Sequence, residues 1–235
     1  MDSRVRYSEV GRDRKLTMPA LIDYLQDCAT FQTEYLGVGI DYMAASQKAW
    51  FLTSWNIVVF EYPRLGDKIQ IRTWAADFGR LQSKRDFRVL GTGDTSIIEA
   101  HSEWVYMDLA AGRPIPVPED EKKLYGREQP AGIPESPRHI KLPAKMESRE
   151  PIRILKIHID TNDHVNNCQY VRLALGLLPD SFPIRTLRAE YRRSAVLGDT
   201  LYPRVAFSGK SYCVALEDED GGRYAIIEFE GEAHA

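Results

Sequence analysis

The stretch from Thr17 to Gly37, TMPALIDYLQDCATFQTEYLG, sets the plan of the N-terminal half. Its apolar residues recur at helical spacing, Thr17 is a common N-cap residue type, and Pro19 suits the opening turn of a helix. Gly37 follows the last residue of the pattern, where glycine often ends a helix. The stretch therefore predicts one long helix.

Segments rich in Val, Ile, Trp, Tyr and Phe follow this helix and are separated by Gly, Asp and Pro. They read WFLTSWNIVVFEY, DKIQIRTWAADF, LQSKRDFRVLGT and TSIIEAHSEWVYMDL. β-branched and aromatic residues bounded by turn-forming residues are typical of strands. We expect these segments to form an antiparallel sheet.

The C-terminal half repeats this order of elements. We expect a strand at IRILKIHI, a helix that begins near Asn162 to Val165, and strands at IRTLRAEYRR, DTLYPRVAF, KSYCVALE and RYAIIEFEG. A local echo supports the repeat, because RLGDKI at 64–69 and VLGDTL at 196–201 occupy the same turn between corresponding strands. A helix and a long antiparallel sheet, formed twice, predict an α+β architecture with an apolar groove between helix and sheet.

Proline marks the connection between the halves. Eight of the 13 prolines fall between Pro114 and Pro151. Proline removes a backbone donor and fixes φ, so such a segment resists both helix and central strand. We expect an N-terminal domain at 1–125, a Pro-rich linker at 126–148 and a C-terminal domain at 149–235.

The composition is that of a globular protein, with 43% hydrophobic and 28% charged residues and a mean hydropathy of -0.38. No apolar run approaches the roughly 20 residues that cross a bilayer, so integral membrane association is not expected. The charged N-terminal segment lacks the apolar core of a secretory signal, which predicts a cytoplasmic location. The three scattered cysteines indicate reduced thiols without a zinc site, and a net charge of -3 gives no attraction to nucleic acid.

The polar residues that suggest chemistry lie in IHIDTNDHVNNCQYV, from Ile157. His158, Asp160, Asn162 and His164 alternate, so their side chains share one face while the backbone is extended. If the helix takes its N-cap at 162 or 163, the backbone N–H groups near 164–166 are free donors at the positive end of the helix dipole.

Thioester hydrolysis needs an activated water or nucleophile and donors that face the oxyanion of the tetrahedral intermediate. This segment supplies both kinds of group. The alternative is that Asp160 and Asn162 only cap a helix and that His164 is a structural histidine.

The chain resembles the acyl-acyl carrier protein (acyl-ACP) thioesterases of plants and bacteria. The family signature, Asp-x-Asn-x-His-Val-Asn-Asn with Tyr three residues later, is matched by Asp160, Asn162, His164, Val165, Asn166, Asn167 and Tyr170. LGVGIDYM, SWNIVVFEYPRLGD and the AEYRR stretch at 189–193 also resemble that family. The resemblance implies two fused hotdog units, each a long helix wrapped by an antiparallel sheet.

The resemblance also implies a function, the hydrolysis of the thioester between a fatty acyl chain and the phosphopantetheine arm of ACP. The C-terminal unit would supply the chemistry and the N-terminal unit the acyl pocket, with no metal or redox cofactor. By analogy, Asp160 and His164 would orient and activate the attacking group, and Asn162 would position the substrate.

The chain departs from the family after the AEYRR stretch. Plant members carry a Glu there, often followed by Cys, whereas this chain carries Ser194 and Ala195. A cysteine nucleophile at 195 is therefore excluded and a carboxylate base at 194 is missing. Ser194 could still hold a water molecule through its hydroxyl, although a serine is a poor base.

Three further features have two interpretations each. Cys168, four residues after His164, would share a helical face with it as a nucleophile, or is simply a small buried residue. His158 would touch the site or face solvent from a strand. The basic residues would either dock acidic ACP or protect strand edges; they are Lys84, Arg85, Arg88, Arg185, Arg188, Arg192, Arg193 and Arg204.

Two rival functions remain from the sequence alone. One is an acyl-coenzyme A thioesterase, and the other is a non-catalytic acyl- or carrier-binding protein, because Ser194 replaces the carboxylate base. A homodimer is compatible with the sequence. The preferred acyl chain length is not readable, because distant segments shape the depth of a pocket.

Overall fold

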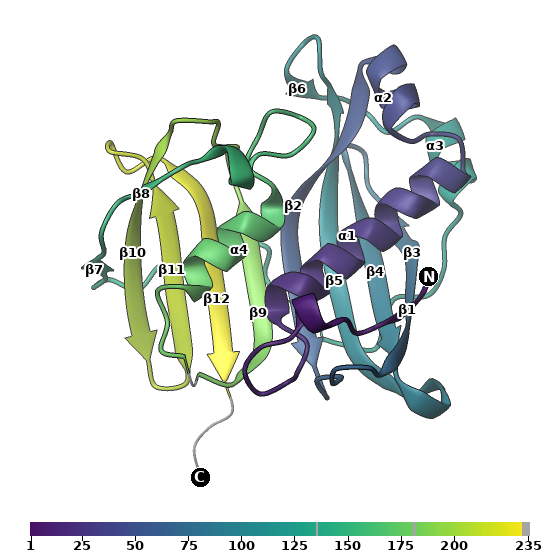
Figure 1. Cartoon of the computed structure of the whole chain (residues 1–235). Coiled ribbons are helices and arrows are strands. Elements are labelled where there is room, and N and C mark those ends of the chain that lie inside the picture. Colours follow the sequence, from purple (N-terminus) through teal and green to yellow (C-terminus); the bar gives the residue numbers. More distant parts are fainter. Residues whose placement is uncertain (135, 181, 232–235) are drawn as a thin grey trace. The chain divides into compact units, whose positions relative to one another are not determined.

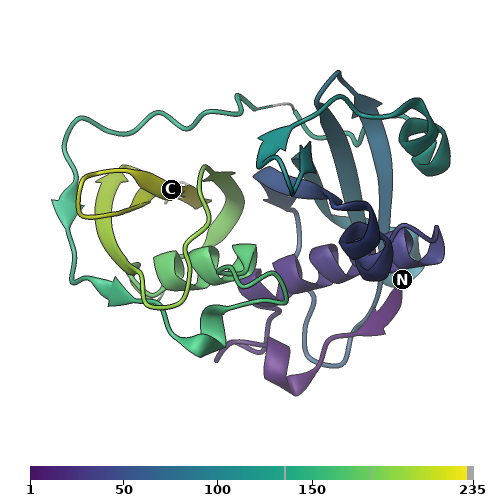
Figure 2. The ribbon, with the colours of Figure 1, turned by 90° about the horizontal axis from the view of Figure 1, so that it is seen from above.

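The computed structural model describes residues 1–134, 136–180 and 182–231, and the chain divides into two compact units. Unit 1 comprises Met1–Thr53 and Ile57–Glu135, and unit 2 comprises Ser54–Asn56 and Ser136–Ala235. Within each unit an antiparallel sheet curves around one main helix, α1 in unit 1 and α4 in unit 2 (Figure 1, Figure 2). The predicted α+β class is confirmed.

Unit 1 holds the longer helix and the longer strands. Its elements are β1 (Asp2–Arg4), the 3-10 helix η1 (Tyr7–Glu9), α1 (Met18–Tyr35), α2 (Ile40–Ser46), β2 (Lys48–Val59), β3 (Lys68–Phe78), β4 (Gln82–Leu90), η2 (Thr92–Asp94), β5 (Ser96–Asp108), β6 (Arg113–Pro114) and α3 (Glu119–Tyr125). The strand order is β1-β3-β4-β5-β2, and β6 pairs with β5. The four strands predicted after the long helix are confirmed as β2 to β5.

Helix α1 begins and ends where its sequence predicts. The Thr17 hydroxyl oxygen accepts a hydrogen bond from the Ala20 N–H at 3.4 Å, and Gly37 follows the helix with φ +75. Leu21, Ile22 and Leu25 are fully buried against the curved sheet. Burial of each such side chain stabilises the unit by about 2 kcal/mol, so the apolar face of the helix holds the unit together.

Unit 2 has a shorter helix and a similar sheet. Its elements are β7 (Glu147–Ser148), β8 (Ile152–Arg153), the 3-10 helix η3 (Lys156–His158), α4 (Asn167–Leu175), β9 (Ile184–Tyr191), β10 (Thr200–Ser208), β11 (Ser211–Glu217) and β12 (Arg223–Gly231). The strand order is β9-β12-β11-β10-β7, and β8 pairs with β10. The last four predicted strands are confirmed as β9 to β12.

The prediction for residues 152–166 was wrong in two respects. The expected strand IRILKIHI is extended only at Ile152–Arg153 and then enters η3, and the helix begins at Asn167 rather than near 162–165. Ile154 explains the early end of the strand, because its N–H donates to Asp199 O at 2.8 Å and its carbonyl accepts from Gly198 N–H at 3.2 Å. These bonds hold residue 154 on a turn, which the apolar pattern could not show.

The repeated LGD turns have the same geometry in both units. In unit 1 the Arg64 N–H donates to Asp67 Oδ2 at 2.7 Å, and in unit 2 the Val196 N–H donates to Asp199 Oδ2 at 3.0 Å. The glycine between them has φ +89 at 66 and +92 at 198, a conformation that favours glycine. The echo seen in the sequence is therefore a structural repeat.

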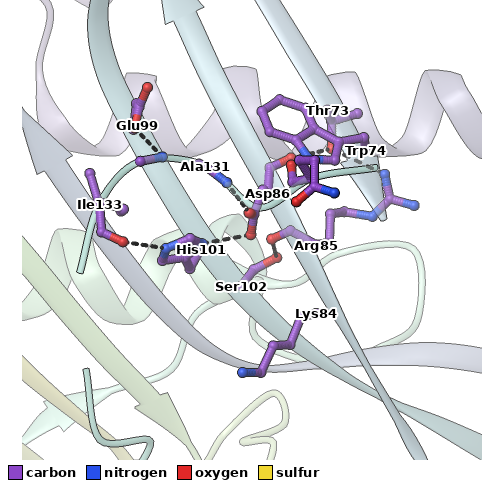
Figure 3. A network of polar contacts seen from close by, with 12 residues as sticks. Thr73, Trp74, Lys84, Arg85, Asp86, Glu99, His101, Ser102, Ala131 and Ile133 are labelled. Atoms are coloured by element: carbon purple, nitrogen blue, oxygen red, sulfur yellow. Dashed lines mark hydrogen bonds and ion pairs between the residues drawn. The ribbon is translucent and has the colours of Figure 1, made fainter. Parts of the chain in front are cut away.

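The Pro-rich segment is anchored to the sheet of unit 1 by a buried carboxylate. Asp86 on β4 accepts the Ala131 N–H at 2.7 Å and contacts His101 Nδ1 at 2.6 Å, and His101 Nε2 lies 3.1 Å from Ile133 O (Figure 3). Trp74 Nε1 also donates to Gln129 O at 2.9 Å. Residues 128–133 thus lie against the face of the sheet opposite α1.

The same segment is anchored to unit 2 in a similar way. Glu190 on β9 accepts the Ile140 N–H at 2.9 Å, and Ile140 packs in a small apolar cluster with Cys213 and Ile226. Burial raises the pKa of Glu190, but hydrogen bonds from Ile140 and His139 and the charge of Arg192 outweigh it, so its pKa is lowered. The predicted linker therefore covers part of a sheet at each of its ends.

Within the described ranges, no helix is both long enough and apolar enough to cross a membrane.

Candidate active site

A tight turn at residues 160–164 carries the three candidate residues before α4. Ile159 and Val165 form an antiparallel bridge, and the Asp160 N–H donates to His164 O at 2.8 Å. Asp160 Oδ1 also accepts the Asn162 N–H at 2.8 Å, which closes the turn from inside. The backbone of Asp160 therefore lies directly opposite that of His164, with Asn162 at the tip between them.

The shared face expected from alternation is not what brings these residues together. The segment is not extended, because η3 precedes it and Asp163 adopts a left-handed conformation with φ +59. The backbones of Asp160 and His164 lie opposite each other because the chain reverses between them. The sequence pattern predicted that these residues lie close together, but the turn, and not an alternating extended strand, is the cause.

The backbone donors expected near 164–166 are also placed differently. The Val165 N–H donates to Ala195 O at 2.9 Å and the Asn166 N–H donates to His158 O at 3.0 Å, so neither is free for an oxyanion. Asn166, not 162 or 163, is the N-cap, and its Oδ1 accepts the Cys168 N–H at 2.9 Å.

Ser194 is placed beside the turn by the next residue, Ala195, whose backbone is hydrogen-bonded to Val165 and Tyr170. Ala195 accepts the Val165 N–H at 2.9 Å and donates its own N–H to the Tyr170 hydroxyl oxygen at 2.7 Å. Burial raises the pKa of Tyr170 to about 12, so its hydroxyl stays neutral. Tyr170 is part of the family signature, and its positioning of Ala195 is a role that the sequence did not reveal.

The candidate side chains are accessible and make few contacts. Asp160 and His164 are half-buried, whereas Asn162 and Ser194 are exposed. In the described part of the chain, the His164 ring, the Asn162 carboxamide and the Ser194 hydroxyl have no hydrogen-bond partner. Their donors and acceptors are therefore available to a substrate and water, and catalytic hydrogen bonds often tighten only in a complex.

The structure excludes one of the two interpretations given for each of His158 and Cys168. His158 is 8% exposed rather than facing solvent from a strand, and its Nδ1 accepts the Leu155 N–H at 3.1 Å. Cys168 is fully buried in the first turn of α4, while His164 precedes the helix, so the two do not share a helical face. Cys168 is therefore a packing residue.

Most residues of the expected basic clusters are neutralised locally. Ion pairs join Arg88 to Glu99, Arg188 to Glu228, Arg192 to Glu190, Arg193 to Asp218 and Arg204 to Glu217. Arg85 is buried and cannot dock a protein partner. The cationic residues thus offer less net charge to ACP than their sequence positions indicated.

No cluster of three or more His, Cys, Asp or Glu side chains that could hold a metal ion occurs among the residues described here.

A family model described as the acyl-ACP thioesterase N-terminal domain matches residues 1–125, more than half of the chain. The chain belongs to the acyl-ACP thioesterase family. Among curated relatives, the chloroplastic palmitoyl-ACP thioesterase of Arabidopsis thaliana is 25% identical over 223 residues, which cover 87% of this chain and 54% of the relative. The dodecanoyl-ACP hydrolase of Cinnamomum camphora is 26% identical over 240 residues, covering 93% of this chain and 63% of the relative. The chain thus spans less than two thirds of the length of these relatives.

Two solved structures have the same fold as this chain over nearly its whole length. An acyl-ACP thioesterase from Bacteroides thetaiotaomicron has a TM-score of 0.89 at 24% identity, covering 99% of this chain and 96% of that one. The 12:0-ACP thioesterase from Umbellularia californica has a TM-score of 0.89 at 21% identity, covering 100% of this chain and 96% of that one. The expected fold of two hotdog units is confirmed.

Proposed function

We propose that this family member hydrolyses fatty acyl-ACP thioesters to free fatty acid and ACP. Unit 2 supplies the chemistry and unit 1 the acyl pocket. The observation that carries the proposal is the turn at 160–164, where Asp160 and His164 face each other across a 2.8 Å backbone hydrogen bond. The names of the curated relatives, which are acyl-ACP thioesterases and hydrolases, support the same substrate class.

In this proposal His164 is the general base. Its half-buried ring takes a proton from water as the water oxygen attacks the thioester carbon. The C–S bond of the tetrahedral intermediate then breaks, and the proton passes to the departing thiolate. Asp160, across the turn, orients the ring and stabilises its charged form.

Asn162 supplies the hydrogen-bond donor to the oxyanion, in place of the backbone N–H groups. The N–H groups of Val165 and Asn166 are already bonded, whereas the Asn162 carboxamide is exposed at the tip of the turn. An amide N–H directed at the developing oxyanion is a suitable stabilising group. Ser194 holds the attacking water through its hydroxyl, in place of the carboxylate that plant members carry.

Unit 1 has a groove that suits the acyl chain. Its volume is about 1380 Å³, and its lining combines apolar side chains from α1 and β3, among them Cys28, Phe31 and Ile71, with the charged residues Arg72, Arg88, Arg127 and Glu128. A concave site with apolar side chains and a few polar groups is the usual form of a small-molecule pocket. We propose that this groove contributes to the acyl pocket.

Turnover of acyl-ACP against acyl-coenzyme A, with one acyl chain on both carriers, tests the proposal. We expect a higher kcat/KM for acyl-ACP, measured as release of free thiol. An equal or higher value for coenzyme A would replace ACP by coenzyme A as the substrate.

A second candidate function is non-catalytic binding of acyl-ACP. It is favoured by Ser194 at the position of the missing carboxylate and by the absence of a hydrogen bond between the Asp160 and His164 side chains in the described chain. Binding of acyl-ACP without release of thiol above background would establish this alternative.

The cytoplasmic location stays a prediction, and the plant relatives are named as chloroplastic proteins.

A further inference from the structure

Two segments of unit 2, residues 152–158 and 194–198, carry apolar side chains that are exposed. These side chains are between 43% and 78% exposed, and they are Leu155, Ile157, Val196 and Leu197. A single exposed aliphatic residue is common on a protein surface, whereas several together mark an interaction surface. We call these four residues the apolar patch.

Backbone hydrogen bonds hold the two segments of the apolar patch together. The Ile154 N–H donates to Asp199 O at 2.8 Å, and the Ile154 carbonyl accepts from the Gly198 N–H at 3.2 Å. The apolar patch comes from the residues that follow Ile154 and from those directly before Gly198. Its side chains therefore belong to neighbouring backbones.

The same two segments support the proposed catalytic turn. The Asn166 N–H donates to the carbonyl of the residue after Ile157 at 3.0 Å, and the Val165 N–H donates to the carbonyl of the residue before Val196 at 2.9 Å. Residues 165 and 166 directly follow His164. The apolar patch is thus fixed beside the residue proposed as the general base.

Unit 1 repeats the backbone that carries the apolar patch. There the Val5 N–H donates to Asp67 O and the Val5 carbonyl accepts from the Gly66 N–H, each at 3.0 Å. In both units a 3-10 helix begins two residues after this paired position, η1 in unit 1 and η3 in unit 2. The positions of the two units therefore correspond one to one.

The side chains on this shared backbone differ between the units. Three of the four positions are polar in unit 1, with Arg6 for Leu155, Ser8 for Ile157 and Arg64 for Val196. An exposed aliphatic side chain gains little hydrophobic stabilisation from the fold. Because the same backbone forms in unit 1 with polar residues, folding does not explain the apolar patch, whereas burial against a partner does.

The charged side chains exposed on the two segments are cations. Arg153 and Lys156 are exposed, and neither forms an ion pair within the described chain. Both segments lack acidic residues, and the exposed acids nearest in the sequence, Glu150 and Asp163, lie outside them. Apolar side chains bordered by unpaired cations fit an acidic protein surface that also presents apolar side chains.

We propose that the apolar patch, together with Arg153 and Lys156, docks the protein part of acyl-ACP. The inference rests on the proposed function, in which an acidic carrier delivers the acyl chain, and it names where that carrier binds. A carrier docked here lies beside the turn that holds His164, so its phosphopantetheine arm can bring the thioester to that turn. Most of the arginines predicted from the sequence to dock ACP are paired within the chain, whereas Arg153 and Lys156 are not.

Steady-state hydrolysis of a dodecanoyl chain on ACP and on free pantetheine tests this docking. Leu155→Ser/Ile157→Ser should raise KM for acyl-ACP at least about tenfold and leave kcat within about twofold, because the apolar contacts serve docking and not chemistry. Both constants for acyl-pantetheine should stay unchanged, since this substrate has no protein part. Tyr7→Ser/Leu65→Ser, at exposed apolar residues of unit 1, is the matched control and should not change KM for either substrate.

Reversal of the two charges tests the electrostatic part of the docking. Arg153→Glu/Lys156→Glu should raise KM for acyl-ACP at least about tenfold at low ionic strength, because both cations would be replaced by repelling charges. Added salt should reduce the difference from the unaltered protein, since exposed charges are screened.

An unchanged KM for acyl-ACP in either double variant of unit 2 would overturn the proposal. So would an equal rise in KM for acyl-pantetheine, or an equal effect of the unit 1 control. Loss of binding to phosphatidylglycerol vesicles in Leu155→Ser/Ile157→Ser, with KM for acyl-ACP unchanged, would assign the apolar patch to a membrane surface instead.

Failure of the proposed function has a separate signature. If the unaltered protein hydrolyses no acyl thioester, the proposed function is wrong, and calorimetric titration of the full chain with acyl-ACP decides the docking. Weaker binding by both double variants of unit 2, with the unit 1 control unchanged, would support the apolar patch as the docking surface. Equal affinities in all four proteins would overturn it.

Discussion

Residues 9–17 of unit 1 and residues 158–166 of unit 2 form the same turn before a helix. Each begins at the end of a 3-10 helix and closes with an antiparallel bridge, Val10–Leu16 in one unit and Ile159–Val165 in the other. The N–H at the first turn position donates across the turn at 2.9 Å in unit 1 and 2.8 Å in unit 2, from Gly11 to Lys15 and from Asp160 to His164. The backbone geometry is therefore repeated.

The left-handed residue and the N-cap are repeated too. Arg14 and Asp163 have φ +63 and +59, and the caps Thr17 and Asn166 each donate their N–H to the last residue of the 3-10 helix, at 2.9 and 3.0 Å. Only the side chains differ, with Gly11, Asp13 and Lys15 where unit 2 has Asp160, Asn162 and His164. The turn is a structural support, and three side chains decide whether it can act chemically.

Exchange of His164 should give the largest effect on catalysis. His164→Lys copies Lys15 of unit 1 and removes the imidazole proposed as the general base, so kcat for acyl-ACP should fall at least about a hundredfold, or about 2.7 kcal/mol. Lys15→His is the matched control and should leave kcat within about twofold. Comparable activity of His164→Lys and the unaltered protein would exclude the ring as the base.

The residue that anchors each turn also differs, with Glu9 in unit 1 and His158 in unit 2. Glu9 is 8% exposed, and its Oε2 accepts from the Arg6 N–H and from the Tyr24 hydroxyl, each at 2.7 Å. Burial raises the pKa of Glu9, but the hydrogen bonds from Arg6 and Tyr24 outweigh this, so its pKa is lowered from 4.5.

Because the pKa of Glu9 is lower in the folded state, its stabilising effect is complete above the unfolded value of 4.5 and is lost as pH falls through the folded value. Glu9→Gln should lower the free energy of unfolding at pH 7 by about 2 kcal/mol, and the deficit should shrink below about pH 4. Urea unfolding at both pH values measures it, with the exposed Glu61→Gln as control. A deficit independent of pH would contradict the assignment.

Asp160→Asn should have a smaller effect on catalysis. An asparagine can still accept the Asn162 N–H but carries no charge to stabilise a protonated His164, so kcat should fall at least about tenfold with little change in melting temperature. Asp13→Asn is the control: Asp13 occupies the position of Asn162, but its Oδ1 makes the same kind of bond as Asp160 by accepting the Lys15 N–H, two residues later, at 3.1 Å. An equal loss in Asp13→Asn would show that the charge acts on folding rather than on chemistry.

Removal of the caps should have the smallest effect. Thr17→Ala and Asn166→Ala each remove an acceptor for a helix N–H and should lower the free energy of unfolding by about 1 kcal/mol. Only Asn166→Ala should also reduce kcat, because this cap holds the turn that carries His164. Similar activity losses in both variants would argue against a difference between the two turns.

The sequence predicted most of the fold because local patterns determine it. Thr17, Pro19 and Gly37 mark the ends of α1, and the apolar segments between turn formers became strands. The same approach failed at 152–166, where Ile154 is held by Gly198 and Asp199, residues far away in the chain. Contacts with residues that are distant in the sequence leave no periodic pattern within the segment 152–166.

For the site, the motif identified Asp160, Asn162 and His164, but the reason for their proximity came only from the structure. The backbone reversal, the use of the Val165 and Asn166 N–H groups, and the link from Tyr170 to Ala195 depend on contacts between separate segments. Arg85 is a similar case, since a basic residue in a strand reads as exposed until its neighbours are known.

By itself the sequence determined the two helix-and-sheet units, the position of the repeated LGD turns and the residue types available for hydrolysis, because helical spacing, turn residues and side-chain chemistry are local properties. Tertiary structure alone decided which backbone donors remain free, which charges are buried, and where the Pro-rich segment lies. Those outcomes depend on hydrogen bonds and burial between residues that are distant in sequence, and neither can be read from one segment.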